Sequence, residues 1–434
     1  MSAIEQLTHL LPDYLARQRW YQGDAPAEVE IVAGEVLREG VPGLVWVLAR
    51  VPGDAAAYQV LVGLRPLSET ENFLEGKGRG FLGDIESDDG PMLAYDALVD
   101  PLLAAAFLGV VAPDEHVETI RPMTVEQSNT SVVYDDRLIL KLFRRVEDTS
   151  NPDAEVVDAL AAAGYDGVPT PVATWRRDGR DLAVVRAFLS GGADGWELAR
   201  TSLRDLYDRR RPPEECGGDF APEASRLGQC LAALHISMAK AFGAQPGQPG
   251  AWADTLRDSL VDVDIEGIDA VYDELAALDP DAAGASIRVH GDLHLAQVLR
   301  TDKGWYVLDF EGEPLLPVAE RVKPSSPLRD VAGMLRSFHY ASEVALIERQ
   351  EASEEELAGL AQAWAARNRQ AFISGYRGTD DIEALLPPGE SWDAVLRAFE
   401  LGKAVYEVAY ERAHRPDWEH IPQRAIARLL APAP

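Results

Sequence analysis

The segment from Val289 to Pro314 constrains the fold of this chain more than any other part of its sequence. It interrupts a mostly helical C-terminal half with a loop, a short strand, a turn and a second short strand: VHGDLHLA, QVLR, DKG and WYVLDF. Strands joined by a tight turn run antiparallel, so the second strand carries the chain back towards the loop. The pattern therefore predicts that Asp309, near the end of the second strand, lies close to the loop that contains Asp292.

The residue types in this segment suit phosphoryl transfer. Asp292 is followed five positions later by the amide Gln297, as the aspartate base and metal-binding amide are spaced in kinase catalytic loops. A carboxylate such as Asp309 is a suitable ligand for Mg²⁺ bound to phosphates. We therefore predict that Asp292 accepts the proton of an acceptor hydroxyl, and that Gln297 and Asp309 bind Mg²⁺.

A zinc site is the competing interpretation of the same segment. His290 and His294 lie four positions apart and would share one face of a helix, but Gly291 is a poor helix residue. No glutamate stands where a zinc hydrolase of this spacing requires one. We expect hydrogen bonds from the two histidines to order the loop.

An upstream lysine and glutamate have the arrangement that kinases use to hold ATP. Lys141 ends the apolar run RLILK, and Glu155 follows in a segment that begins with Asn151 and Pro152, a favourable helix start. A strand lysine paired with a glutamate on the next helix positions the α- and β-phosphates in kinases. Lys141 and Glu155 are therefore predicted to form the cofactor-binding pair.

Two further segments are candidates for contact with the nucleotide. Residues 126–131 form a polar loop without glycine where a phosphate-covering loop is expected, so backbone amides and hydroxyls of Ser128, Asn129 and Thr130 would make the contacts. The apolar run from Val184 to Leu189 is the expected hinge beside adenine, whose edge would meet backbone groups of Arg186 to Phe188. Gly76-Lys77-Gly78 has no Ser or Thr after the lysine and is a poor phosphate loop.

Composition and charge narrow the class of protein. The 434 residues are 47% hydrophobic and 26% charged, as in ordinary globular proteins. Lys and Arg total 41 against 72 Asp and Glu, a net charge of −31 that disfavours nucleic acids and anionic membranes as partners. The N-terminus lacks the features of a signal peptide, and no apolar run is long enough to span a bilayer. We expect a cytoplasmic enzyme with a small-molecule acceptor, acting as a monomer or weak homodimer.

Several motifs together resemble those of the actinobacterial maltokinases, which are relatives of the aminoglycoside phosphotransferases. The motifs span nearly the whole chain: ARQRWY, QSNTSVV, ILKLFRR, NPDAE, VHGDLHLAQVLRT, DFEGEP, SPLRDVAGMLRSF and KAVYEVAYE. The resemblance implies an α+β, bilobal, protein-kinase-like fold with an N-terminal cap. It also implies Lys141 on ATP, Asp292 as base, and Gln297 with Asp309 on Mg²⁺. The expected divisions are a cap at residues 1–112, a β-rich nucleotide lobe at 113–190 and a helical lobe at 191–434. Residues 68–90, polar and rich in glycine, are expected to form a long loop.

Departures from the maltokinase pattern bear on the acceptor. Ala296 and Gly402 replace residues of that pattern, and the change at Gly402 removes a carboxylate expected beside the acceptor pocket. The same fold group includes actinobacterial glucosamine kinases. Carboxylates and aromatic rings would suit an aminosugar, since carboxylates pair with its ammonium and rings stack on its apolar face. The residues assigned to this substrate site are His294, Glu311, Tyr406, Glu407, Tyr410, Glu411 and Trp418.

These observations favour an ATP-dependent sugar kinase that converts glucosamine to glucosamine 6-phosphate. The alternatives are a maltokinase that forms maltose 1-phosphate and an inactive kinase-like binding subunit. An aminoglycoside-resistance kinase fits the cap and the DFEGEP segment poorly.

Overall fold

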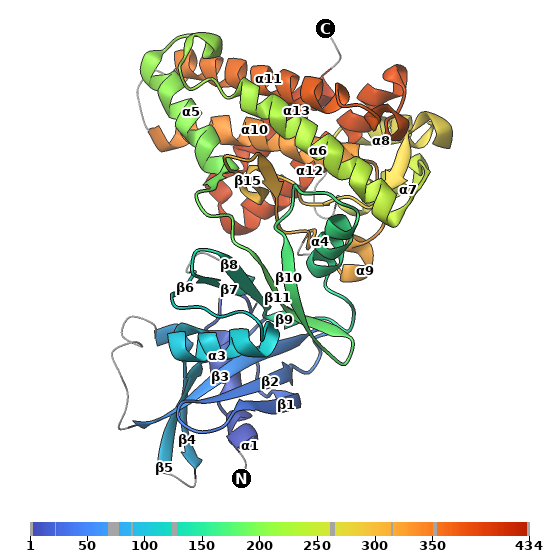
Figure 1. The fold of residues 1–434 in the computed structure, drawn as a ribbon. Coiled ribbons are helices and arrows are strands. Elements are labelled where there is room, and N and C mark those ends of the chain that lie inside the picture. The colour runs from blue at the N-terminus through green and yellow to red at the C-terminus, as the bar shows by residue number, and fades with distance from the viewer. Residues whose placement is uncertain are drawn as a thin grey trace. The chain divides into compact units, whose positions relative to one another are not determined.

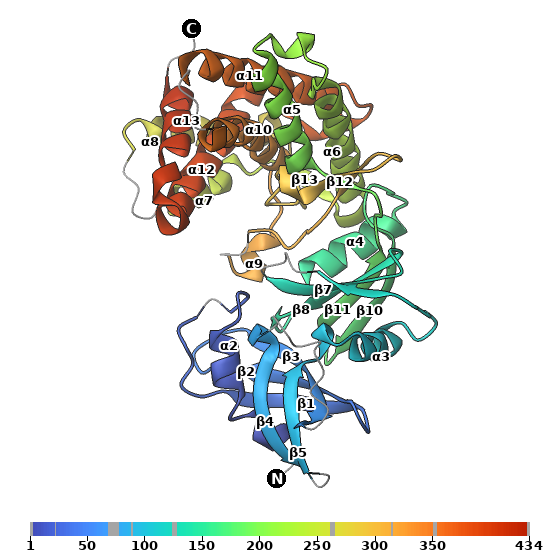
Figure 2. The ribbon, with the colours of Figure 1, turned by 90° about the vertical axis from the view of Figure 1, so that its left-hand side faces the viewer.

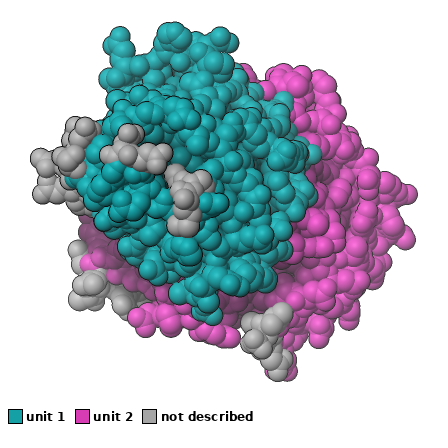
Figure 3. All heavy atoms as spheres, turned by 90° about the horizontal axis from the view of Figure 1, so that it is seen from below, with its two compact units in different colours: residues 1–158, 169–190 teal, residues 159–168, 191–434 magenta. Residues whose placement is uncertain are grey.

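The computed structural model describes residues 3–21, 23–67, 78–87, 90–123, 128–260, 265–313, 316–349 and 354–431. The chain divides into two compact units, shown in different colours in Figure 3. Unit 1 comprises residues 1–158 and 169–190, and unit 2 comprises residues 159–168 and 191–434. Strands dominate unit 1 and helices dominate unit 2, so the predicted α+β class is confirmed (Figure 1).

Unit 1 begins with two short helices and an antiparallel sheet. The sheet has the strand order β1-β2-β3-β5-β4, and β9 also pairs with β3. The elements are α1 (Ala3–Leu7), α2 (Leu11–Ala16), β1 (Glu30–Arg38), β2 (Gly43–Arg50), β3 (Ala57–Pro66), β4 (Phe81–Ser87), β5 (Gly90–Asp96), α3 (Pro101–Val111) and β9 (Arg145–Val146). Of the expected loop at 68–90, residues 81–87 form β4, so that expectation is wrong there. They pair with β5, a long-range contact that local composition does not reveal.

Strand β2 shows why this sheet is apolar on both faces. Successive side chains of a strand point to opposite faces. Leu44, Trp46 and Leu48 belong to one buried cluster, whereas Val45 and Val47 belong to another. The first cluster lies against α3, and the second is closed by α1 and α2. This explains the unbroken hydrophobic run in the sequence.

A second antiparallel sheet of unit 1 carries the predicted nucleotide residues. Its order is β10-β11-β8-β7-β6. The strands are β6 (Ile120–Pro122), β7 (Asn129–Tyr134), β8 (Leu138–Phe143), β10 (Pro171–Arg177) and β11 (Arg180–Ala187). Helix α4 (Pro152–Ala162) follows β9, and the side chain of Asn151 accepts from the amide of Asp153 as a helix N-cap does.

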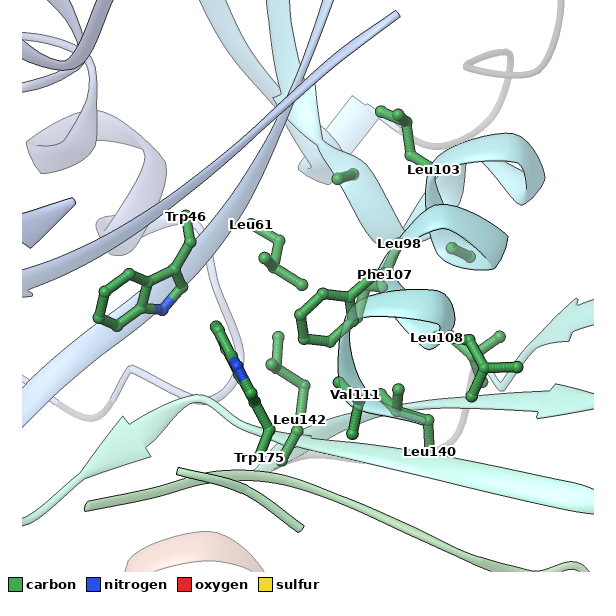
Figure 4. Packing of buried hydrophobic residues seen from close by; sticks show 14 of the residues in the cluster. Trp46, Leu61, Leu98, Leu103, Phe107, Leu108, Val111, Leu140, Leu142 and Trp175 are labelled. Atoms are coloured by element: carbon green, nitrogen blue, oxygen red, sulfur yellow. The ribbon is translucent and has the colours of Figure 1, made fainter. Parts of the chain in front are cut away.

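The two sheets of unit 1 share one hydrophobic core. Figure 4 shows Trp46 from the first sheet, Trp175 from the second and Phe107 from α3 pointing into this core. The rings of Trp46 and Trp175 lie 5.5 Å apart and those of Phe107 and Trp175 lie 5.1 Å apart, both edge to face. The division predicted between residues 112 and 113 therefore falls within one packed unit, and it stays a prediction.

Unit 2 is built mainly from helices. Helix α6 packs on α11, and α10 packs on both α11 and α12 (Figures 1 and 2). The helices are α5 (Gly195–Arg209), α6 (Ala221–Phe242), α7 (Pro249–Asp258), α8 (Ile268–Ala276), α9 (Val318–Arg321), α10 (Leu328–Arg349), α11 (Glu354–Arg377), α12 (Gly389–His414) and α13 (His420–Leu430). Among the described residues, no helix is long and apolar enough to cross a membrane.

The predicted hairpin interrupts these helices. Strand β15 (Val298–Arg300) pairs with β16 (Trp305–Val307), and β12 (Ala193–Asp194) extends the sheet on the other side of β15. A second small sheet joins β13 (Ala244–Pro246) to β14 (Ala285–Ile287), which leads into the loop that contains Asp292.

Candidate active site

One face of helix α10 holds the loop around Asp292. Residues at positions i, i+3 and i+7 of a helix lie along one face, and here they are Asp330, Gly333 and Ser337. Both carboxylate oxygens of Asp330 accept from the loop, each at 2.8 Å, from the amides of residues 290 and 291. The Ser337 hydroxyl accepts from the amide of residue 295 at 3.0 Å.

Gly333 lets the loop approach α10 closely. A Cβ atom at this position would lie 2.5 Å from the carbonyl oxygen of Leu293, which no side chain tolerates. Asp330 is itself buried, and His235 Nε2 lies 3.1 Å from its carboxylate. The loop is thus fixed by backbone hydrogen bonds to a buried helix face.

The hairpin brings Asp309 to Gln297 as predicted. The Gln297 side-chain amide donates to Asp309 Oδ2 at 3.2 Å, which leaves the carbonyl oxygen Oε1 as its ligand atom. Asp309 has φ of 66°, a conformation uncommon for a residue other than glycine and often found at functional sites. His290 orders the loop, since its Nδ1 accepts from the amide of Asp292 and its Nε2 donates to the carbonyl of Leu308.

Asp292 forms a partly buried ion pair that the sequence did not predict. Its Oδ1 lies 2.8 Å from Nζ of Lys403 in α12, and the two side chains are only 19% and 17% exposed. Burial alone would raise the pKa of Asp292. The positive charge of Lys403, with smaller contributions from His294 and His290, outweighs burial and holds the pKa of that carboxyl well below its usual range.

Lys403 itself lies among groups that stabilise a cation. Glu313 Oε1 is 3.5 Å from its Nζ, and the Tyr406 ring centroid is 4.5 Å from the same atom. Burial acts to lower the pKa of Lys403, but Asp292 and Glu313 raise it above its ordinary value. Burial also raises the pKa of Tyr406 to about 12. Both Lys403 and Asp292 are therefore charged near neutral pH.

The predicted substrate residues of α12 divide between two faces of that helix. Tyr406 and Tyr410 lie on the face of Lys403, and their rings stack with centroids 6.4 Å apart. Glu407 and Glu411 lie on the face towards α10. Glu407 pairs with Arg336, and Glu411 accepts from the Tyr340 hydroxyl at 2.6 Å.

The two carboxylates expected in an acidic, aromatic pocket thus have partners within the fold. Glu411 is buried, and both of its oxygens also accept from Arg415, whose guanidinium lies 4.4 Å from the centroid of the Trp418 ring. In this structure Glu411 joins α12 to α10, and a role for it on the acceptor stays a prediction. The same holds for Trp418.

The structure also shows what surrounds Gly402. A Cβ atom there would lie 2.3 Å from a methyl carbon of Leu256 in α7, so this position faces another helix. A longer side chain at this position would meet α7, and the inference from the absent carboxylate stays a prediction.

The remaining substrate candidates lie near the catalytic segment. Burial, the main cause, lowers the pKa of His294, whose Nδ1 accepts from the amide of Ala296 at 3.3 Å. The carbonyl oxygen of Glu311 accepts from Arg321 at 3.1 Å. Sugar contacts of His294 and Glu311 stay predictions.

In unit 1, Lys141 lies on β8 next to an acid that the sequence reasoning missed. Its Nζ is 3.6 Å from Oδ2 of Asp153, which is buried at the start of α4. The same carboxylate oxygen accepts from Arg186 at 2.9 Å. Asp153 thus joins the lysine to β11, while the predicted partner Glu155 lies half a turn further along α4.

The other predicted nucleotide residues have defined partners in unit 1. The Thr130 hydroxyl accepts from Arg144 at 2.7 Å, and the Asn129 amide donates to the Ser128 hydroxyl at 3.2 Å. The Phe188 backbone amide donates to the carbonyl of Arg137, so that amide is already used within the sheet. Residues 124–127 lie outside the described residues, as do Gly76 and Lys77, and contacts of Ser128 to Thr130 and Arg186 to Phe188 with nucleotide stay predictions.

Comparisons with known proteins identify the class of enzyme. Residues 119–369 match the phosphotransferase enzyme family, and residues 14–100 match the maltokinase N-terminal cap domain. The first match covers more than half of the chain, and the chain belongs to this phosphotransferase family. The resemblance noted from the sequence motifs is thereby confirmed.

Two relatives and one solved structure that resemble this chain are glucosamine kinases. The chain is 30% identical to a glucosamine kinase of Mycolicibacterium smegmatis over 71% of its own length and 79% of the relative. It is 28% identical to a glucosamine kinase of Streptacidiphilus jiangxiensis, over 71% of its own length and 73% of the relative. A glucosamine kinase structure in complex with glucosamine, ADP and inorganic phosphate matches with a TM-score of 0.66 and 22% identity, covering 98% of this chain and 99% of the other. This likeness confirms the kinase-like fold.

Proposed function

We propose that this protein transfers the γ-phosphoryl group of ATP to a hydroxyl of glucosamine, forming glucosamine 6-phosphate and ADP. The observation that carries the proposal is the loop held by α10, which presents Asp292 beside the Gln297–Asp309 pair. The identity of the acceptor is supported by the glucosamine kinase of Mycolicibacterium smegmatis, whose similarity extends over most of both chains.

The reaction needs few groups. A bond forms between the acceptor oxygen and the γ-phosphorus, the bond to the β–γ bridging oxygen breaks, and the hydroxyl proton passes to Asp292 and then to water. Because the pKa of Asp292 is held low, this carboxylate mainly orients the hydroxyl and takes its proton late. Lys141, held by Asp153, would place its positive charge on the phosphates of ATP.

The donor set in unit 2 fits Mg²⁺. The carboxylate of Asp309 and the amide oxygen of Gln297 are hard oxygen ligands held together by a hydrogen bond. When bound, the metal ion would neutralise phosphate charge during transfer.

The sugar is tested by measuring ADP release from purified protein with Mg²⁺ and ATP. Glucosamine, N-acetylglucosamine, glucose, maltose and an aminoglycoside are compared side by side, with Asp292→Asn as the matched inactive control. Glucosamine should give the highest kcat/KM, and N-acetylglucosamine, which lacks the ammonium, should be far poorer. A preference for maltose would reject this acceptor and favour the maltokinase alternative, which the cap-domain match brings into the comparison.

The same assay addresses the remaining alternative. An inactive binding subunit would release no ADP with any of the five sugars although the protein is folded. We also place the enzyme in the cytoplasm as a monomer or weak homodimer, which fractionation and light scattering would test.

A further inference from the structure

Lys403 is a lysine of unit 2 that the fold places beside the catalytic carboxylate of Asp292. It lies on α12, 111 positions from Asp292 in the sequence, yet its ammonium group reaches the one carboxylate in the loop that the mechanism uses. A buried lysine needs a strong compensating interaction, because burial disfavours its charged form. Asp292 and Glu313 supply that compensation from two different segments.

Helix α10 fixes both members of the pair. Through Asp330 and Ser337 it holds the loop of Asp292. Through Arg336 and Tyr340, one turn apart, it holds Glu407 and Glu411 of α12. The base and the lysine are therefore placed by one rigid element, as a preorganised site requires.

Lys403 binds only one of the two carboxylate oxygens of Asp292. Lys403 binds Oδ1. Within the part of the chain that the structure describes, Oδ2 makes no hydrogen bond, so it is the atom that can accept from an acceptor hydroxyl. A general base must lie about 2.6–3.2 Å from that oxygen, which brings the Lys403 charge close to the reacting hydroxyl.

We propose that Lys403 is a positioning residue for phosphoryl transfer, which keeps Asp292 ionised and turns its free oxygen towards the acceptor. The proposal rests on the proposed function for its acceptor. The loop motif places His294 two positions after Asp292, and burial favours the neutral form of this histidine. A fixed positive charge beside the base therefore comes from a distant helix.

The proposal predicts a change in pH dependence when Lys403 is removed. The charged and titratable groups near Asp292 and its partner are Lys403, His290, His294, Asp309, Glu313 and Tyr406. Among the groups that act directly on Asp292, Lys403 has the largest effect in keeping it ionised. Without Lys403, less of the effect of burial is offset, and the pKa of Asp292 rises.

The first experiment measures kcat against pH for the wild type, Lys403→Met and Lys403→Arg, with Lys323→Met as a control that removes an exposed lysine of the same unit. Lys403→Met should lower kcat about 10–100-fold at neutral pH. The pH profile of Lys403→Met should also gain a region at low pH that the wild-type profile lacks. There kcat falls roughly tenfold per pH unit below the new pKa of Asp292. Lys403→Arg should retain the wild-type profile, and KM for ATP should be unchanged in all variants. A Lys403→Met profile with the shape of the wild-type profile would overturn the proposal.

A second measurement works without catalysis and without a substitution at Lys403. The ¹³C shift of the Asp292 carboxyl, assigned by comparison with Asp292→Asn, should remain that of a carboxylate down to about pH 4.5 in the wild type. Protonation of Asp292 above pH 5 would reject the role of Lys403, even if its variants fail to fold. If the wild type releases no ADP with glucosamine, the proposed function fails, while this titration still tests whether Asp292 stays ionised.

Discussion

Each unit of the molecule contains an aspartate paired with a basic residue, fully buried in unit 1 and partly buried in unit 2, and the two pairs differ in how many of the aspartate's oxygens are hydrogen-bonded. In unit 1, Arg144 binds Asp96, and their side chains are 1% and 8% exposed. Oδ2 of Asp96 also accepts from the Tyr14 hydroxyl at 2.7 Å, and its Oδ1 caps a short helix through the amide of Leu98. In unit 2, Lys403 occupies one oxygen of Asp292 and leaves the other available.

The Arg144–Asp96 pair stabilises the fold, whereas we propose that the Lys403–Asp292 pair acts in the reaction. Arg144 donates to Thr130 and lies over the ring of Trp20, so it joins the first sheet and its helices to the second sheet. Every oxygen of Asp96 is used for structure. Asp292 retains an accepting atom beside a fixed charge, as a base that orients a hydroxyl requires.

The largest effect is expected for Asp292→Asn. The amide cannot accept the hydroxyl proton, so kcat should fall about 10³–10⁴-fold. Nucleotide binding should change little, since Lys141 and the Gln297–Asp309 pair are intact. Steady-state kinetics and ATP binding by calorimetry check both parts, and near-normal turnover would remove Asp292 from the mechanism.

Arg144→Met should act on stability instead. It leaves the Asp96 carboxylate buried without its cation, which costs about 3–5 kcal/mol. Arg121→Met is a suitable control, because its pair with Asp136 is exposed and worth about 1 kcal/mol or less. Urea unfolding measures both. Equal losses of unfolding free energy in the two variants would show that burial of the Arg144–Asp96 pair adds nothing to stability.

Asp309→Asn should weaken the metal site while leaving the fold intact. Loss of one charged ligand is expected to raise the Mg²⁺ concentration for half-maximal rate about 10–100-fold. Asp302→Asn, in the exposed turn of the same hairpin, provides the control. An unchanged Mg²⁺ requirement in Asp309→Asn would exclude Asp309 as a ligand.

The last prediction depends on pH and concerns His339, a buried group of α10 that remains uncharged. Its burial, with nearby Arg336, Arg428 and Arg369, lowers its pKa to about 2. In the unfolded chain a histidine has a pKa of about 6.5, so only the unfolded state gains this proton as pH falls below that value.

The contribution of His339 is therefore fully present above about pH 6.5 and is lost progressively as pH decreases towards 2, by about 1.4 kcal/mol per pH unit. His339→Gln should remove this slope, which unfolding experiments at pH 6, 5 and 4 would reveal. Parallel stability curves for the wild type and the variant would show that His339 is protonated in the folded protein.

The features predicted well from the sequence were those that neighbouring residues determine. The turn between QVLR and WYVLDF places Gln297 and Asp309 together through one hairpin, so their spacing was sufficient.

The features that were missed depend on contacts between distant segments. Lys403 meets Asp292 across 111 positions, and Asp330 meets the loop across about 40. The spacing of Asp330, Gly333 and Ser337 was a usable signal, since it marks one helix face with two oxygen acceptors and a residue without a side chain. The contacts of Gly402 with α7 and of Glu411 with α10 were also not foreseen, because sequence alone does not tell which face of α12 meets another helix.

The most direct test of this account compares kcat for Arg144→Met and Lys403→Met with glucosamine and Mg²⁺-ATP, at a temperature where thermal melting shows both variants folded. The account predicts a kcat close to that of the wild type for Arg144→Met and a loss of about tenfold or more for Lys403→Met. A similar loss in both variants, or a loss confined to Arg144→Met, would contradict it.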